Sequence, residues 1–374
     1  NDDMYYSFQY GHHIPVEIIE RIEIIRGPGS VIYGGAAELA VISIITKKPE
    51  YESEGFVSYQ SGFMRDVYSR RGSSFYFGFK EEDYTLSLNG GLQEGYHSDR
   101  EFTDLWGYSY ETGRSGYSKT NSILLNASLD YKGWKQRFIY DRYRTRENYE
   151  YYNLWRLHFE SYLYQTQYDF KVNENLTIRP KFQFKQQEPW NSPKNTWDGG
   201  EVNDFDIRSR KYSGEISAFY QLEHHELLMG IAHDWVKGVD KRHEGVLGRA
   251  GINELSFRNL ALYGQAILRY ELANLTIGGR YEDNSIFGSN FVPRIAITKK
   301  INEHYMKFMV SKAFRTPSIQ NLAYNSQIKT EKTDVIELEA GIQINDQTHL
   351  TANIFYQNIK DPIIFSYTGT GDYD

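Results

Sequence analysis

The sequence of 374 residues contains no cysteine, which excludes disulfide bonds and metal sites built from thiolates. It also lacks an apolar run of the roughly 18 residues that a membrane-spanning helix requires. The densest apolar run, residues 39–45, is short and contains Ser43. The formal net charge is -7, and no run of basic residues is suited to phosphate contacts. These absences argue against a helical membrane protein and against a nucleic-acid-binding protein.

Aromatic residues are abundant although the mean hydropathy is low. They make up 16% of the chain, with 32 Tyr and 21 Phe, while the mean hydropathy is -0.62. A disordered acidic chain would be poor in aromatic residues. A transmembrane β-barrel reconciles the two values, because only alternate residues face lipid while the others face a wet lumen.

The first fifty residues differ in pattern from the rest of the chain. Two short runs rich in β-branched residues, 22–25 and 40–46, flank a segment of small residues. This segment contains Gly27, Pro28, Gly29, Gly34 and Gly35. Gly-Pro-Gly favours a tight turn, and Ser30 is suited to cap one short helical turn that reaches Tyr33. The pattern predicts a strand, a turn, a short helix and a strand in a small mixed domain.

From residue 51 onward, long segments alternate between apolar and polar residues. Clear examples are residues 84–92, 211–222, 260–272 and 336–344. Such segments approach or exceed the roughly 9–11 residues with which a tilted strand crosses a bilayer. Charged residues fall largely on the polar face or at the ends, as a lipid-facing surface requires. The pattern predicts about fifteen transmembrane strands.

The connections between these segments alternate in length. Short polar turns are predicted at 173–175, 223–225, 271–274 and 302–304, and longer stretches at 95–119, 187–208, 238–254, 281–290 and 316–329. In a bacterial barrel the short turns are periplasmic and the long loops extracellular. No internal repeat of fixed period is present, which disfavours a propeller or solenoid.

Three stretches carry a resemblance to one family. "IERIEIIRGPGSVIYG" and "AVISIITKKPE", within residues 19–50, resemble the C-terminal half of the plug domain of TonB-dependent outer-membrane receptors. "KAFRTPSIQNL" at 312–322 and "EKTDVIELEAGIQINDQTHLTANIFYQNIKDPI" at 331–363 resemble late parts of that family's barrel. One departure is Leu39-Ala40, where many relatives carry Gly-Gly before the last plug strand.

The resemblance implies an all-β transmembrane barrel with a small α/β plug inside its lumen. Residues 1–48 would be the C-terminal part of the plug and residues 49–374 part of the barrel. Family barrels have 22 strands, so roughly seven strands are expected outside this chain. In the family, about 100 further plug residues precede this point. The sequence opens at Asn1 with neither a basic region nor an apolar signal core, so either a signal peptide has been removed or the start is missing, and the resemblance implies the second. The chain is therefore expected to be a fragment of a longer protein.

The resemblance also implies a function without covalent chemistry. The family imports scarce nutrients, such as iron-siderophores, haem or cobalamin, across the outer membrane of Gram-negative bacteria, and TonB supplies the energy mechanically. The expected partners are TonB with its inner-membrane complex, outer-membrane lipid including lipopolysaccharide, and a small nutrient ligand. No cofactor and no enzymatic activity are expected. The alternative is a plugged barrel that serves as a structural scaffold or a signalling sensor.

The plug motif supplies the first set of candidate residues. It comprises Arg21, Glu23, Arg26, Gly27, Pro28, Gly29, Ser30, Tyr33 and Gly34. In relatives, charged plug residues at such positions pair with carboxylates of the barrel wall, and buried charge requires a partner. The candidate partners are Glu215, Glu271, Glu337 and Glu339. Static pairs that hold the plug are favoured over a latch that breaks during transport.

Aromatic and histidine residues supply the second set. The candidates for ligand contact are Trp106, Trp190, Trp197, His12 and His13. Gly27–Gly29 is not followed by Gly-Lys-Ser/Thr, so a phosphate loop is disfavoured. His224 and His225 are adjacent, and neighbours on a strand point to opposite faces, so no metal site is predicted. No catalytic set is predicted either, since no nucleophile stands in sequence with suitable partners.

Overall fold

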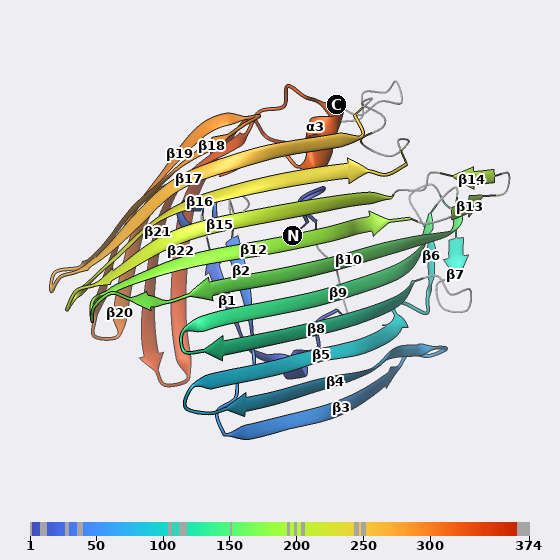
Figure 1. Ribbon diagram of the computed structural model, residues 1–374, viewed down its shortest axis with the longest axis horizontal. Coiled ribbons are helices and arrows are strands. Elements are labelled where there is room, and N and C mark those ends of the chain that lie inside the picture. Colours follow the sequence, from blue (N-terminus) through green and yellow to red (C-terminus); the bar gives the residue numbers. More distant parts are fainter. Residues whose placement is uncertain are drawn as a thin grey trace.

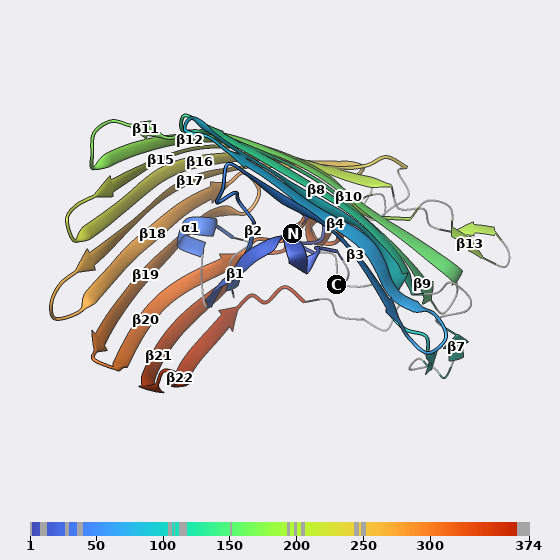
Figure 2. The same ribbon diagram turned by 90° about the horizontal axis from the view of Figure 1, so that it is seen from below.

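One large antiparallel β-sheet forms most of the molecule and curves around a small N-terminal segment, residues 2–48 (Figure 1 and Figure 2). The computed structural model describes residues 2–7, 13–26, 30–35, 40–103, 107, 109–111, 118–149, 152–192, 195–197, 200–202, 206–242, 247 and 252–364. Each long strand pairs with its neighbours in the chain, so the sheet is a continuous meander. The predicted antiparallel fold of long strands is confirmed.

The sheet has 16 strands within the described ranges. Its main path runs through β3 (Ser53–Phe63), β4 (Tyr68–Lys80), β5 (Tyr84–Tyr96), β8 (Lys119–Tyr131), β9 (Trp134–Tyr149), β10 (Tyr152–Tyr168), β12 (Leu176–Asn191), β15 (Ile207–Gln221), β16 (His225–Asp240), β17 (Glu254–Arg269), β18 (Asn274–Asn284), β19 (Gly288–Ile301), β20 (His304–Arg315), β21 (Glu331–Asn345) and β22 (Thr348–Lys360). The short β11 (Phe170–Lys171) pairs with β12.

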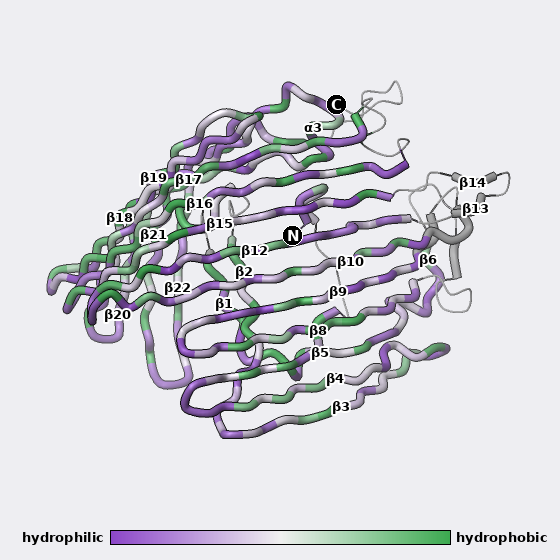
Figure 3. Tube along the Cα trace, in the orientation of Figure 1, coloured by the Kyte–Doolittle hydropathy of each residue, from purple (hydrophilic) through white to green (hydrophobic). Residues whose placement is uncertain are grey.

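The alternation of side chains gives the sheet two different faces. On the convex face, Ile216, Leu262 and Ile295 are each about half exposed, and similar residues continue across neighbouring strands. Residues between them point to the concave face, which carries Ser217, Glu282 and Glu337 among its buried polar side chains. Figure 3 shows this alternation as repeated changes of hydropathy along each strand. So broad an exposed apolar surface marks a face that contacts a membrane or another protein.

The two ends of the strands differ in their connections (Figure 1). At one end, here called the turn end, tight turns join the strands; the β8–β9 turn uses Lys132 and Gly133 at φ 47° and 85°. The other end, the loop end, carries additional elements between strands. These are β6 (Glu101–Thr103), β7 (Ser109–Glu111), β13 (Asn195–Trp197), β14 (Gly200–Val202) and α3 (Ile319–Tyr324). Among the described residues, no helix is long and apolar enough to cross a bilayer.

One predicted long loop is wrong. Residues 281–290 were expected to form an extended connection, but β18 continues to Asn284 and β19 begins at Gly288. The Asn284 side-chain oxygen accepts hydrogen bonds from the backbone N–H groups of Ile286 and Phe287 at 2.8 and 3.2 Å. This local capping closes the chain into a tight turn, which polarity alone did not predict.

The N-terminal segment lies on the concave side of the sheet (Figure 2). It contains η1 (Val16–Ile18), β1 (Ile19–Arg26), α1 (Ser30–Tyr33) and β2 (Ala40–Thr46). β1 and β2 form a two-stranded antiparallel sheet of their own, with Ile22 opposite Ile44. The predicted order of strand, short helix and strand is present, while residues 27–29, the predicted turn, lie outside the described part of the chain.

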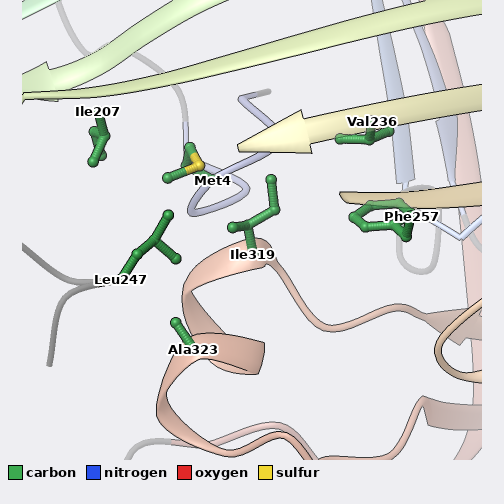
Figure 4. Packing of buried hydrophobic residues seen from close by; sticks show 7 residues of the cluster. All are labelled: Met4, Ile207, Val236, Leu247, Phe257, Ile319 and Ala323. Carbon is green, nitrogen blue, oxygen red and sulfur yellow. The ribbon is translucent and has the colours of Figure 1, made fainter. Parts of the chain in front are cut away.

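Small apolar clusters form where the N-terminal segment meets the sheet. Near the loop end, buried residues from the segment, three strands and α3 pack together with Leu247 (Figure 4). They are Met4, Ile207, Val236, Leu247, Phe257, Ile319 and Ala323. A second cluster joins Val31 of α1 to Val292 and Phe314 of the sheet. The core of the molecule is therefore divided into local contacts and is not one continuous layer.

A partly buried carboxylate joins three strands at the turn end. Asp169, between β10 and β11, accepts hydrogen bonds from Lys135 Nζ at 2.7 Å and Arg179 Nη2 at 3.1 Å. Burial alone would raise the pKa of Asp169, but the bonds from Arg179 and Lys135 outweigh burial and hold the pKa below its ordinary value of 3.8. The stabilisation is therefore complete above about pH 4 and is lost as the pH falls through the lowered value.

We expect Asp169→Asn to lower the free energy of unfolding by about 1–2 kcal/mol at neutral pH, because two cations lose their shared carboxylate. The measurement is the midpoint of thermal unfolding in detergent. The difference from the unmodified protein should shrink as the pH falls from the ordinary carboxyl value of 3.8 through the lowered pKa of Asp169. Asp346→Asn is the matched control, since Asp346 is exposed in the β21–β22 turn. An equal effect of both substitutions would contradict the role of the pairing.

Candidate functional site

The interface between the N-terminal segment and the concave face of the sheet is the candidate site. The segment contacts widely separated strands, from β3 at one edge to β20 near the other. Most contacts are made by polar side chains of the sheet, which the alternation described above places on this face. The interface is therefore built mainly from individual hydrogen bonds, with apolar contact limited to the two clusters.

At the loop end, the first residues of the segment form a compact turn around Asp2. Asp2 is buried, and its carboxylate accepts the backbone N–H groups of Met4, Tyr5 and Ser7 at 2.8, 2.7 and 2.9 Å. The turn is attached to the sheet by Asp3, whose Oδ2 lies 2.9 Å from Lys185 Nζ. The side chains of Asp3 and Lys185 are largely removed from water, and a buried charge without a partner is costly. This ion pair therefore helps to hold the turn around Asp2 against the sheet.

Two phenols of the same turn are held in the neutral form. Burial raises the pKa of Tyr5 well above its usual range, and burial raises the pKa of Tyr6 to about 12. Tyr6 shares a hydrogen bond of 2.9 Å with the hydroxyl of Thr316, just before α3. Neutral phenols at physiological pH add hydrogen bonds to the interface without adding charge.

An aromatic cluster on β9, β10 and β12 holds the following part of the segment. Trp190 Nε1 donates to Ser7 Oγ at 2.5 Å, and its ring lies edge-on to Tyr143 and Phe159 at 6.3 and 5.7 Å between centroids. His13 Nε2 lies 3.0 Å from Asp141 Oδ2, and its ring lies edge-on to Tyr143 at 6.0 Å. Two candidates predicted separately, Trp190 and His13, therefore meet at one tyrosine.

The backbone of Trp190 is strained. Its φ of 54° lies in the left-handed region, which bulky residues rarely occupy. Such strain costs of order 1–3 kcal/mol and persists only where the surroundings fix the conformation. Here the ring contacts and the hydrogen bond to Ser7 fix it. The strained residue thus stands at a contact between the sheet and the N-terminal segment.

Polar side chains also hold the segment toward the opposite edge of the sheet. The Glu17 carboxylate accepts hydrogen bonds from Gln60 Nε2 and, at 3.4 Å, from Ser74 Oγ. At the end of β2, Asn126 Nδ2 donates to Thr46 Oγ1 at 3.2 Å. Each of these bonds joins single side chains, and each contributes about 0.5–1.5 kcal/mol net.

The short helix α1 sits against β17–β20 with very close backbone contact. Gly34 has a φ of 78°, and a Cβ there would lie 3.2 Å from Arg280 Nη2 and 3.3 Å from Glu282 Oε2. A Cβ at Gly35 would lie 2.6 Å from Phe314 Cε2. Glycine at these two positions therefore allows the helix to reach the sheet.

Beneath Gly34, the sheet carries a chain of paired charges. Arg280 and Glu282 are both more than nine-tenths buried and lie 2.7 Å apart. The Arg280 guanidinium lies 5.6 Å from the Tyr263 ring, and the Tyr263 hydroxyl donates to Glu215 at 2.6 Å. Glu215 in turn pairs with Lys181 at 2.5 Å. The charges of this network are thus balanced within the sheet itself.

The predicted ion pairs of Arg21 and Glu23 with the sheet do not form. Arg21 pairs within its own strand, with Glu23 at 2.7 Å and Glu20 at 2.5 Å, and these side chains are about half exposed. The prediction failed because β1 bonds only to β2 along its length, which leaves Arg21 away from the wall. The Arg26 side chain lies outside the described residues.

Three of the four carboxylates predicted as partners make other contacts, and the fourth lies outside the strands. Glu215 pairs with Lys181, and Glu337 pairs with Lys307 at 2.9 Å. Glu339 accepts from the Tyr305 hydroxyl at 2.7 Å and from Asn353 at 3.2 Å. Glu271 is not on a strand, because β17 ends at Arg269, and it lies in the turn before β18. Residues on neighbouring strands of the sheet lie nearer to these carboxylates than the N-terminal segment does. The carboxylates therefore pair within the sheet.

Several predicted residues fall outside the described part of the chain. These are Trp106, His12, Gly27, Pro28 and Gly29, together with the side chains of Trp197 in β13 and Ser30 in α1. Tyr33 is described and half exposed. The residues that attach the segment and were not predicted are Asp3, Glu17, Asp141, Lys185 and Asn126. In the sequence, only two features mark these residues. Each is polar, and each lies on the polar face of a strand or near a turn.

A cavity of about 350 Å³ lies between the end of β2 and the concave face near the turn end. Its lining combines Thr46 and Lys48 of the segment with Ser128, Arg137 and Gln167 of β8, β9 and β10. The apolar side chains of Ile44, Ile45 and Leu129 complete the lining, so the cavity is mixed in character. Within the described residues, no group of three His, Asp or Glu side chains is placed to hold a metal ion.

Comparisons with known proteins agree with this geometry. The family model described as TonB dependent receptor-like, beta-barrel, matches residues 49–374. A probable TonB-dependent siderophore receptor, PirA of Acinetobacter baumannii, is 23% identical over 372 residues, which cover 85% of this chain and 48% of that protein. The vitamin B12 transporter BtuB of Vibrio vulnificus is 23% identical over 367 residues, which cover 96% of this chain and 57% of that protein.

A solved structure shows the same fold. The crystal structure of a variant ferric enterobactin receptor from Pseudomonas aeruginosa, in complex with enterobactin, matches with a TM-score of 0.73 at 16% identity. The match covers 99% of this chain and 65% of that one. The chain spans about half the length of the curated relatives it matches.

We expect Gly35→Ala to loosen the N-terminal segment, because the added methyl group would overlap the Phe314 ring. The cost of such overpacking is about 1–3 kcal/mol. The measurement is amide hydrogen exchange of β1 and β2, which should become faster while exchange in the sheet is unchanged. Gly214→Ala is the control, since a Cβ at Gly214 meets nothing within 4 Å. Unchanged exchange in Gly35→Ala would contradict this packing.

Proposed function

Because the chain belongs to the TonB-dependent receptor family, we propose that it is part of an energy-coupled importer in the outer membrane of a Gram-negative bacterium. In this proposal residues 1–48 are the C-terminal part of the plug, and residues 49–374 are part of the barrel wall. The convex apolar face contacts lipid and the concave polar face lines the lumen. The loop end faces the outside of the cell and the turn end faces the periplasm.

One observation carries the proposal. The N-terminal segment forms its own two-stranded sheet and is attached to the wall mainly by single hydrogen bonds and ion pairs. Such a body can shift without breaking the backbone ladder of the wall. The cavity beside Thr46 lies where a shift of β2 would widen a polar passage toward the turn end.

The energy for the shift would come from TonB, since the outer membrane holds no source of ATP. The polar contacts at Asp3, His13, Glu17 and Thr46 set the resistance that a pulling partner must overcome. Removing several bonds at once costs more than the roughly 1 kcal/mol of each, so thermal motion alone leaves the plug seated. Mechanical coupling to TonB therefore suits an interface of this kind.

The proposed ligand is a scarce nutrient of the class that the relatives' names give, an iron-siderophore or cobalamin, with haem as a further member of the class. Such ligands would enter at the loop end, where the aromatic cluster of Tyr143, Phe159 and Trp190 lies beneath the loops. No cofactor is required, because import changes no covalent bond of the ligand. The competing reading is a plugged barrel that acts as a scaffold or sensor and imports nothing.

The chain lacks cysteine, so a reversible lock can be introduced cleanly. Thr46→Cys with Asn126→Cys would join the segment to the wall, because these side chains already touch at 3.2 Å. Asn89→Cys with Asn126→Cys joins two directly opposed residues of β5 and β8 within the wall and is the control. Both pairs are placed in the full-length protein in cells that lack other receptors.

We expect oxidation of the Thr46–Asn126 pair to abolish uptake of radiolabelled ferric enterobactin or cyanocobalamin, and reduction to restore it. The control pair should transport normally in both states, because it leaves the plug free. Uptake should also vanish without TonB. Normal uptake with the segment locked, or without TonB, would contradict the proposal. Uptake of neither probe by the unmodified protein would favour the scaffold or sensor.

A further inference from the structure

The cavity between the end of β2 and the concave face, near the turn end, contains an arginine without a carboxylate partner. Arg137 of β9 lines this cavity of about 350 Å³. Its Nε donates to Asn126 Oδ1 at 2.9 Å, and in the described part of the chain its guanidinium makes no ion pair. Arg137 is only partly exposed, and a charge that is largely removed from water is costly without a partner. Its terminal N–H groups are therefore available to an acceptor from outside the chain.

A buried polar network fixes the position of Arg137. Asn126 accepts the bond from Arg137, and its Nδ2 donates to Asn89 Oδ1 at 3.0 Å and to Thr46 Oγ1 at 3.2 Å. Asn89 in turn donates to Ser87 Oγ at 3.3 Å. Because this network holds Nε, the planar guanidinium has a fixed place at the cavity wall. A guanidinium held in this way is suited to a carboxylate or a phosphate, whose oxygens match its donors.

Cations outnumber carboxylates around the cavity. The charged residues of its lining are Lys48, Asp130, Lys135 and Arg137. Lys135 is already bonded to Asp169 at 2.7 Å. Asp130 is the register partner of Lys135, whereas Arg137 stands opposite the uncharged Ser128. Two cations, Lys48 and Arg137, thus remain against one carboxylate, so the cavity attracts anions.

The rest of the lining suits an organic anion better than an inorganic one. Gln165, which stands opposite Arg137 in the register, and Gln167 supply amide groups. Ile44 and Leu129 supply apolar contact. Sites for small organic molecules have volumes of roughly 300–1,000 Å³ and combine apolar walls with a few polar groups. The cavity has this size and this mixed lining.

The cavity is shared between the N-terminal segment and the wall. One side is formed by the end of β2, and the other by β5, β8, β9 and β10, which are neighbours in the sheet (Figure 1). Thr46 and Arg137 both bond to Asn126, so an anion at Arg137 contacts the network that holds β2. A solute that passes between β2 and the wall toward the turn end therefore meets Arg137.

We propose that this cavity binds an organic oxyanion, a carboxylate or phosphate group of the imported solute, and that Arg137 is the residue that contacts it. The charged group lies on the Arg137 guanidinium, and the body of the solute lies against Ile44 and Leu129. The inference rests on the function proposed above and deepens it, because it names the chemical class of the solute and a site on its path.

Protection of a cysteine placed in the cavity tests the site. Ser128→Cys in the full-length protein puts a thiol opposite Arg137 in the register. The rate of its reaction with a small neutral thiol reagent is measured in detergent without TonB, and the protein without this substitution gives the background rate. The probes are citrate, which is an organic anion, trimethyl citrate, which has the same body without the charge, and inorganic phosphate.

Three further substitutions are each combined with Ser128→Cys. Arg137→Gln removes the cation and keeps a hydrogen-bonding side chain, whereas Arg137→Lys keeps the charge and loses the planar fork. Arg144→Gln is the matched control, because Arg144 is an exposed arginine of the same strand. Heat-dependent gel mobility confirms the folding of each variant.

We expect citrate to slow the reaction of the thiol. The citrate concentration for half of this effect should rise about tenfold or more in Arg137→Gln, because hydrogen bonds to a charged group are the strong ones. Arg137→Lys should give a smaller rise, and Arg144→Gln should give none. Trimethyl citrate should not protect the thiol.

Three results would overturn the proposal: no protection by citrate, equal protection in Arg137→Gln and Arg144→Gln, or equal protection by citrate and trimethyl citrate. Equal protection by inorganic phosphate and citrate would overturn the assignment to an organic solute. The purified protein without TonB imports nothing, whereas uptake is measured in cells. Failure of this site and failure of the proposed import are therefore distinguishable.

Discussion

The structure depends on one constraint, the alternation of side chains along strands whose backbone groups are satisfied by their neighbours. Lateral pairing provides every interior strand with hydrogen-bond partners, so the side chains are free to meet two different environments. The convex face exposes aliphatic and aromatic side chains. The concave face presents Ser, Asn, Glu and Arg side chains to the N-terminal segment. A shift of register by one residue would exchange the two faces, and this fixes the register along the whole sheet.

The same constraint explains how the N-terminal segment is held. A polar concave face cannot form a broad apolar interface, so the segment is attached by Asp3–Lys185, His13–Asp141 and similar single contacts. The small clusters around Met4 and Val31 add local apolar contact. An attachment of many modest bonds is firm at rest and can be released in sequence. The strained backbone of Trp190 lies at one of these contacts. If the hydrogen bond between Trp190 and Ser7 breaks, one of the interactions that hold Trp190 in the left-handed conformation is lost.

Much of the fold could be predicted from the sequence, because the relevant signals are local. Alternation over residues 211–222 and 260–272 predicted β15 and β17, and the small residues before residue 40 predicted the short helix between two strands. The partners of Glu215, Glu337 and Glu339 could not be predicted, since they depend on which strands become neighbours. The turn at Asn284 depended on one side chain capping the backbone, which polarity does not reveal.

The central claim is that one sheet separates lipid from a polar lumen, and β16 tests it most directly. Single cysteines at positions 227 to 232, in a chain with no other cysteine, can carry spin labels in membranes containing the full-length protein. The measurement compares collision with oxygen, which is concentrated in lipid, and with a water-soluble nickel reagent. Labels at Leu227, Met229 and Ile231 should favour oxygen, and labels at Leu228, Gly230 and Ala232 should favour nickel. Equal access of the nickel reagent to all six positions would contradict the account.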